Sequence, residues 1–166
     1  MMINVDKIAL GGGCHWCTEA VFQKLKGVTK VQQGYVASIG KAEAYSEGII
    51  VYYNPEIISL KELIKIHLYT HKSTSQHSFR TKYRSAVYYF DKEKEPLIKS
   101  ILIEVQRDFE HKLITQILQL ESFKLSRESI RDYYNKNPKA PFCTRYIEPK
   151  LNLLRSDFKE NLIHSN

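Results

Sequence analysis

Three consecutive glycines, at positions 11–13, are the feature that most constrains how this chain folds. Residues 7–10 before them predict a short strand, and apolar residues at helical spacing follow them as far as Leu25. Glycine tolerates backbone angles that other residues resist, so this run favours a tight strand-to-helix turn. Cys14 comes directly after the turn and is expected to open the helix, with Gly27 as its stop signal.

The next segment predicts two strands and a second helix. Residues 29–36 and 48–53 have strand character, and the second run ends at Asn54-Pro55. Ser59 is the expected N-cap of the helix that follows, and Glu62 completes a capping box with it.

Further along, residues 85–90 predict a strand and Pro96 marks the start of a third helix. Residues 113–118 are expected to form the last strand, and a C-terminal segment rich in leucine follows. This order of strands and helices predicts an α+β fold with two layers.

Length and composition limit the class of protein. A chain of 166 residues, 43% of them hydrophobic, is expected to form a single domain over residues 1–166 with 139–166 as a C-terminal tail packed on it. Lys and Arg exceed Asp and Glu by 25 to 18, but they are scattered, so we expect a solvated surface and no nucleic-acid partner. We also expect a monomer with no membrane segment and no signal peptide. Three cysteines favour thiol chemistry in the cytoplasm over a secreted disulfide framework.

The stretch from Gly13 to Cys17, Gly-Cys-His-Trp-Cys, carries the strongest functional signal. The reactive form of cysteine is the thiolate, which the partial positive charge and free N–H groups of a helix N-terminus stabilise. The glycines before Cys14 leave room for a substrate to reach its sulfur, and Trp16 offers an apolar wall beside it. A buried structural cysteine is the alternative interpretation of Cys14 from this motif alone.

The motif and several later landmarks resemble the methionine sulfoxide reductase A family. The matches keep one order from about residue 9 to residue 151, and they are Gly12-Gly13-Cys14-His15-Trp16, Gly34-Tyr35, Tyr53-Asn54-Pro55, Ile58-Ser59, His71, Tyr83-Arg84-Ser85-Ala86, Asn137-Pro138, Pro141-Phe142-Cys143 and Pro149-Lys150-Leu151. The resemblance implies a mixed sheet with a ferredoxin-like core. It also implies thiol-dependent reduction of methionine (S)-sulfoxide, free or in proteins.

The resemblance assigns roles residue by residue. Cys14 matches the nucleophile that becomes a sulfenic acid, and Trp16 matches the wall that holds the substrate methyl group. Glu47 matches the proton donor, a glutamate expected just before a strand. Tyr83 matches a tyrosine that helps bind the sulfoxide oxygen. The structural alternatives are that Glu47 is an exposed residue at a strand edge and that Tyr83 is an ordinary aromatic residue packed beside a strand.

The sulfenic acid must then be recycled through an intramolecular disulfide. Cys143 falls where many family members carry a resolving cysteine, on a flexible tail near the active site. Cys17, at helical distance from Cys14, is the second candidate, and Cys143 is preferred. The resemblance implies thioredoxin as the external reductant, with no metal and no other cofactor.

Four departures from the family pattern bear on the substrate pocket. His15 stands where a phenylalanine lines the methyl pocket, and the loop before Ser46 is short enough to omit a second substrate-binding tyrosine, for which Tyr45 is the candidate substitute. Residues 72–82 lack the family's aspartate, and Ile130 replaces a histidine.

Three other functions compete with the reductase hypothesis. The first is a divergent thiol oxidoreductase or redox sensor that uses Cys14 and Cys17 without sulfoxide reduction. The second is a sulfoxide or peptide binder with an inert Cys14. The third is a metal site made of the three cysteines and a histidine, but Cys-x-x-Cys is only half of a zinc site.

Overall fold

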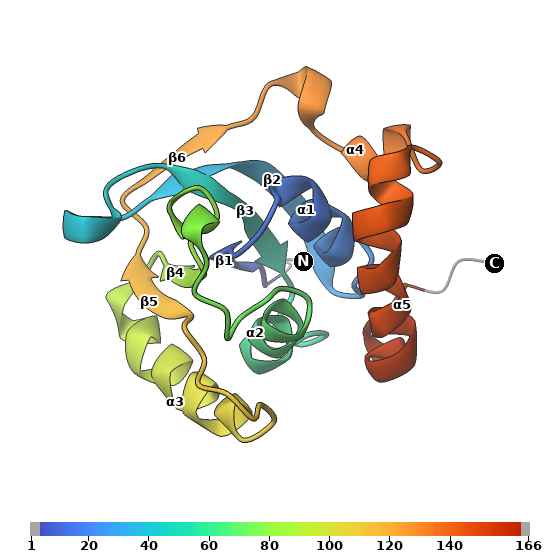
Figure 1. Cartoon of the computed structure of the whole chain (residues 1–166). Coiled ribbons are helices and arrows are strands. Elements are labelled where there is room, and N and C mark those ends of the chain that lie inside the picture. Colours follow the sequence, from blue (N-terminus) through green and yellow to red (C-terminus); the bar gives the residue numbers. More distant parts are fainter. Residues whose placement is uncertain (1–3, 164–166) are drawn as a thin grey trace.

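A computed structural model describes residues 4–163 of the chain, and Figure 1 shows its arrangement. Strands and helices follow the expected α+β order. In chain order they are β1 (Asp6–Gly11), α1 (His15–Gln23), β2 (Val28–Ala37), β3 (Ser46–Tyr53), α2 (Leu60–Tyr69), β4 (Ala86–Tyr89), α3 (Glu95–Gln106), β5 (Gln116–Gln119), β6 (Ser122–Leu125), α4 (Tyr133–Lys136) and α5 (Glu148–Asp157).

One mixed sheet organises the molecule. Its strand order is β5-β4-β1-β3-β2-β6; the β4–β5 pair is parallel and the other pairs are antiparallel. The four central strands, with α1 and α2 as crossovers, have the connectivity of a ferredoxin-like βαββαβ unit. The expected mixed sheet and ferredoxin-like core are therefore confirmed. Within residues 4–163, no helix is both long and apolar enough to cross a bilayer.

Alternation along the central strands divides the core between the two faces of the sheet. In β1, Ile8 and Leu10 pack into the larger cluster with α1 and α2, whereas Ala9 joins a smaller cluster on the opposite face. The C-terminal helix α5 also contributes to the larger cluster and lies beside α1 in Figure 1. Helix α1 is therefore packed between the sheet and the C-terminal segment.

The N-cap of α2 is the one expected from the sequence, whereas α1 ends earlier than expected. The Ser59 hydroxyl accepts from the Glu62 N–H and the Glu62 carboxylate accepts from the Ser59 N–H, which is the expected capping box. Helix α1, however, ends at Gln23 rather than at Gly27. Gly27 has φ +89° in the turn into β2, so it serves the turn and not the helix cap.

Two expectations for the C-terminal third are wrong. The strand near residue 118 is not the last one, because β6 follows it and pairs with β2 at the sheet edge. The segment around Cys143 is not a flexible tail: residues 143–147 form a π-helical turn that runs into α5, and the Cys143 side chain is fully buried. Leu151 and Leu154 anchor α5 in the core, which explains the order of this segment.

Two neighbouring histidines, His67 and His71, support the glycine turn. The His67 and His71 rings lie 4.2 Å apart, and His67 Nε2 donates to the Gly11 carbonyl at 2.8 Å. A Cβ at Gly12 would come within 2.4 Å of the His71 ring, so only glycine fits there. Burial lowers the pKa of His67 to about 4 and lowers the pKa of His71 well below its ordinary value.

These two histidines make stability depend on pH. Their neutral forms are favoured in the folded state, so their contribution is complete above the ordinary pKa of 6.5 and is lost as the pH falls toward 4. We expect His67 alone to reduce the free energy of unfolding by roughly 2 kcal/mol between pH 7 and pH 5. Urea denaturation at both pH values measures this loss. It should be smaller in His67→Gln and unchanged in the exposed control His111→Gln; equal losses in all three proteins would contradict the assignment.

Candidate active site

Cys14 is the N-cap residue of α1, as the glycine turn predicted. Its backbone is extended, with φ −58° and ψ 129°, and its carbonyl accepts from the N–H groups of Cys17 and Thr18. The thiol therefore lies at the positive end of a nine-residue helix and is partly exposed.

The second thiol of the motif lies against the first. The Cys17 side chain hydrogen-bonds the Cys14 sulfur, and this contact, together with backbone N–H groups of Trp16 and Cys17, lowers the pKa of Cys14 against the opposing effects of burial and of Glu47. The same hydrogen bond raises the pKa of Cys17, which is buried. This contact thus favours the thiolate form of Cys14 and the protonated form of Cys17.

A cleft of about 710 Å³ opens beside Cys14 and Cys17. The glycine turn forms its floor, and Tyr83 lines the wall that comes from the segment between α2 and β4. The opposite wall comes from the C-terminal segment and includes Phe142 and Lys150. Cys14, Cys17 and Tyr83, three of the residues expected at the site, therefore share one cavity.

Glu47 does not line the cleft; it contacts His15, the residue next to Cys14. It is the second residue of β3, not a residue before the strand, and it is only 8% exposed. Its Oε1 accepts from the His15 N–H at 3.1 Å and lies 3.5 Å from His15 Nε2, while Oε2 lies 3.6 Å from Lys82 Nζ. Because it is buried, Glu47 is not the exposed strand-edge residue that was the alternative interpretation.

The His15 ring is oriented by one clear hydrogen bond. Its Nδ1 lies 2.9 Å from the Gly34 carbonyl, which only accepts, so Nδ1 carries the proton. Burial lowers the pKa of His15, and the lone pair of the neutral ring at Nε2 then faces the Glu47 carboxyl. His15 and Glu47 consequently form a close buried pair beside Cys14.

Three expected substrate-binding residues do not line this cleft. Trp16 stacks on Tyr133 with ring centroids 3.9 Å apart and meets Phe142 edge-on, so it connects α1 to the C-terminal segment. Tyr45 is half exposed, and its hydroxyl bonds Ser122 on β6. His15 also lies outside the cleft lining.

The third cysteine lies deeper than expected. Cys143 is fully buried and does not line the cleft, and burial raises its pKa. It belongs to the same core cluster as Cys17, and the two thiols are close enough to influence each other electrostatically.

Residues that sequence reasoning did not single out complete the surroundings of Cys14. Lys150 lines the cleft, donates to the Thr70 carbonyl and lowers the pKa of the neighbouring Cys17 against its other surroundings. Arg80 donates to the carbonyls of Gly12 and Tyr83 at 2.9 Å, which ties the glycine turn to the tyrosine wall. Lys150 belongs to the Pro149-Lys150-Leu151 motif that resembles the family, whereas no sequence pattern indicated a role for Arg80.

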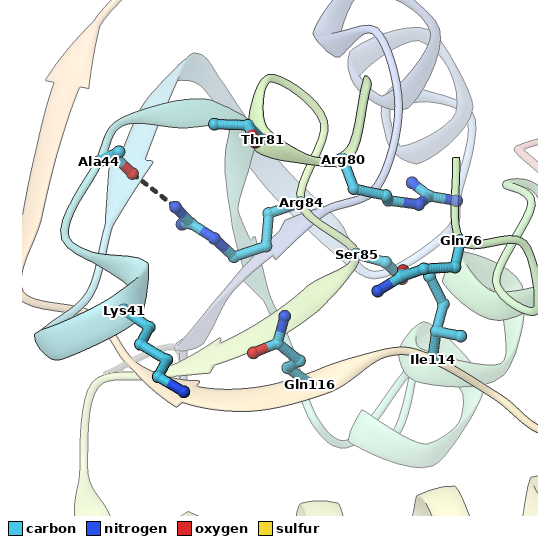
Figure 2. Close-up of a pocket in the computed structure, with 9 residues that line it drawn as sticks. All are labelled: Lys41, Ala44, Gln76, Arg80, Thr81, Arg84, Ser85, Ile114 and Gln116. Carbon is cyan, nitrogen blue, oxygen red and sulfur yellow. Dashed lines mark hydrogen bonds between the residues drawn. The ribbon is translucent and has the colours of Figure 1, made fainter. Parts of the chain in front are cut away.

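A second, smaller cavity of about 190 Å³ lies on the other side of this segment (Figure 2). The buried Arg84 guanidinium points toward the Ala44 carbonyl, to which it donates at 2.7 Å, and Gln116 reaches in from β5. Arg84 also donates to the Tyr88 hydroxyl. Through these two bonds Arg84 fastens the segment that follows Tyr83 to β4 and to the loop before β3.

The metal hypothesis finds no ligand set. Within residues 4–163, no three His, Cys, Asp or Glu side chains are grouped so that they could hold an ion. All three cysteines are free thiols in the structure.

Comparison with known proteins agrees with this geometry. The family model for peptide methionine sulfoxide reductase matches residues 6–162. A peptide methionine sulfoxide reductase MsrA from Psychrobacter sp. (strain PRwf-1) is 33% identical over 94% of this chain and 98% of its own length.

Solved structures give the same fold. Mxr1 from Saccharomyces cerevisiae in reduced form is 25% identical with a TM-score of 0.74, covering 84% of this chain and 89% of that chain. Mxr1 in complex with Trx2 matches with 23% identity and a TM-score of 0.63, covering 77% and 87%. Because the family model spans almost the whole chain and a relative that is 33% identical matches nearly its full length, the chain belongs to the peptide methionine sulfoxide reductase family.

Proposed function

We propose that this enzyme reduces the S-epimer of methionine sulfoxide with Cys14 as the nucleophile. The observation that carries the proposal is the position of Cys14: a thiol of lowered pKa at the N-terminus of α1, open to a cleft. That combination is what thiolate attack on a bound electrophile requires.

The first step transfers one oxygen atom from the substrate to the enzyme. The Cys14 thiolate attacks the sulfoxide sulfur, the oxygen takes up a proton, and collapse of the adduct leaves a Cys14 sulfenic acid and methionine. Cysteine is oxidised by two electrons and the sulfoxide is reduced by two. Glu47 is the proposed proton source, supported by its buried pairing with His15 next to Cys14. Tyr83 is the proposed donor to the sulfoxide oxygen, supported by its place in the cleft wall.

Cys17 is the proposed first resolving cysteine. Its thiol already contacts Cys14, and its attack on the sulfenic acid forms the Cys14–Cys17 disulfide and releases water. The resemblance favoured Cys143 for this step; we reverse the order because Cys17 lines the cleft and contacts Cys14, whereas Cys143 is fully buried and does not line the cleft. Cys143 then exchanges with Cys17 and frees Cys14.

An external dithiol such as thioredoxin is the proposed reductant of the final disulfide. Mxr1, a solved relative, has been crystallised with Trx2. The disulfide is reduced to two thiols while the reductant's dithiol becomes a disulfide. We further propose that the chain works as a single-domain cytoplasmic monomer, supported by the continuous sheet and by its three free thiols.

One observation keeps a second function in view. The direct contact between Cys14 and Cys17 also suits a thiol oxidoreductase or redox sensor that forms the same disulfide without a sulfoxide. Disulfide formation with peroxide, but no methionine from sulfoxide peptides, would identify that function.

Activity tests the main proposal. We expect methionine to form from the S-epimer of a methionine sulfoxide peptide with dithiothreitol, and not from the R-epimer. Cys14→Ser should abolish turnover, and Glu47→Gln should reduce kcat by about a hundredfold, the usual size of a general acid contribution. Amino acid analysis measures the product. No turnover by a folded protein whose Cys14 is alkylated normally would refute the proposal.

The resolving order predicts what each cysteine variant leaves behind. With one equivalent of substrate and no reductant, Cys17→Ser should retain a Cys14 sulfenic acid that dimedone labels, because Cys143 is buried. Cys143→Ser should retain no sulfenic acid and should hold a Cys14–Cys17 disulfide. Mass spectrometry distinguishes the products. A Cys14–Cys143 disulfide in Cys17→Ser would restore the order that the resemblance implied.

The pairing of the two thiols predicts the pH dependence of alkylation. Cys17→Ala removes the hydrogen bond that most lowers the pKa of Cys14, so the half-maximal alkylation rate should move to higher pH. Cys17→Ser keeps a donor and should shift it less. Iodoacetamide kinetics in a Cys143→Ser background measure both. An unchanged profile in Cys17→Ala would show that the helix N-terminus acts alone.

A further inference from the structure

Charge is distributed unevenly around the cleft. Two of its lining residues, Lys72 on the α2 side and Lys150 on the C-terminal side, carry ammonium groups, and no lining residue carries a carboxylate. Within residues 4–163, neither lysine has an acidic side chain within 4.0 Å. By contrast, nearby Lys82 is already paired with Glu47. The cleft therefore presents cations whose counter-charge is not supplied by the protein.

Aromatic side chains extend the cleft beyond the reacting sulfur. Phe79, which is 65% exposed, and Tyr146, which is 47% exposed, both line it. Exposed aromatic groups around a cavity of about 710 Å³ are typical of a surface that binds more than one side chain. A methionine sulfoxide side chain at Cys14 leaves these groups uncovered.

Free methionine sulfoxide fits this distribution only in part. Its α-carboxylate can pair with a lysine, but its α-ammonium group needs acceptors, and the cleft offers it no carboxylate. In a peptide neutral amides replace both charges, so the lysines are left to pair with the carboxylates of flanking residues.

Resting on the proposed function, we infer that the preferred substrate is methionine sulfoxide within an acidic protein segment. Aspartate or glutamate within a few residues of the sulfoxide pairs with Lys72 at the rim of the cleft, and an apolar neighbour packs on Phe79 or Tyr146. The net charge of +7 adds long-range attraction for such segments. Lys72 is then a specificity residue that contacts substrate away from the reacting atoms.

Three peptides of equal length test the inference. Each has one methionine (S)-sulfoxide and blocked ends, and the flanking residues are glutamate, glutamine or lysine. We expect kcat/KM to fall in that order, by about five- to tenfold from glutamate to lysine at low salt, mainly through KM. The ratio should shrink toward one at about 0.5 M salt because exposed charges are screened. Free methionine sulfoxide should be poorer than the glutamine peptide.

Charge reversal supplies the matched control. Lys72→Glu should invert the preference toward the lysine-flanked peptide, and Lys72→Gln should flatten it. Lys99→Glu makes the same change in net charge on the exposed side of α3, away from the cleft, and should keep the native ratio. Equal kcat/KM for the three peptides, or equal effects of Lys72→Glu and Lys99→Glu, would overturn the inference.

Binding to Cys14→Ser separates this inference from the proposed function. Calorimetry should give a lower Kd for the glutamate-flanked peptide than for the lysine-flanked one. If no peptide is turned over but this difference in Kd persists, the reductase proposal fails and the acidic-segment site stands. If turnover occurs without any difference between peptides, the reductase proposal stands and the inference fails.

Discussion

The structure depends on the close contact between the glycine turn and the adjacent side chains of His67 and His71. Gly12 has no Cβ because the His71 ring occupies that space, and the Gly11 carbonyl is held by His67. Arg80 holds the turn from the other side through the Gly12 carbonyl. Three groups from distant parts of the chain thus fix the backbone that ends β1 and begins α1. The Cys14 thiol at the start of that helix therefore has a fixed orientation and lies in the electrostatic field of the helix N-terminus.

Once the turn is fixed, the chemistry of Cys14 is controlled by its neighbours on α1 and β3. The helix N-terminus and Cys17 favour the thiolate, whereas burial and Glu47 oppose it. A carboxyl group near a thiolate is unfavourable electrostatically, but in the proposed mechanism it supplies a proton once the sulfoxide oxygen is bound. In the proposed mechanism the contact with Cys17 has two roles, because the group that stabilises the thiolate then attacks the sulfenic acid.

The C-terminal segment makes the site a cleft. Trp16 stacks on Tyr133, and Leu151 and Leu154 bury α5 against the core, so residues 142–150 form a wall opposite Tyr83. The same packing buries Cys143. Apolar packing of this segment therefore determines both the shape of the substrate cleft and the accessibility of the third thiol.

The amino-acid sequence by itself determined the local features and the family. The glycine turn before Cys14 and the Ser59–Glu62 capping box depend on neighbours close in sequence, so they could be predicted and were confirmed. The short strand β6, the burial of Cys143 and the outward position of Tyr45 could not, because each depends on contacts with residues remote in the chain. Only the tertiary structure brought Lys72 and Lys150 to one cleft without a carboxylate. Charge balance at a site is a sum over elements that meet in space, and the order of residues along the chain does not contain that sum.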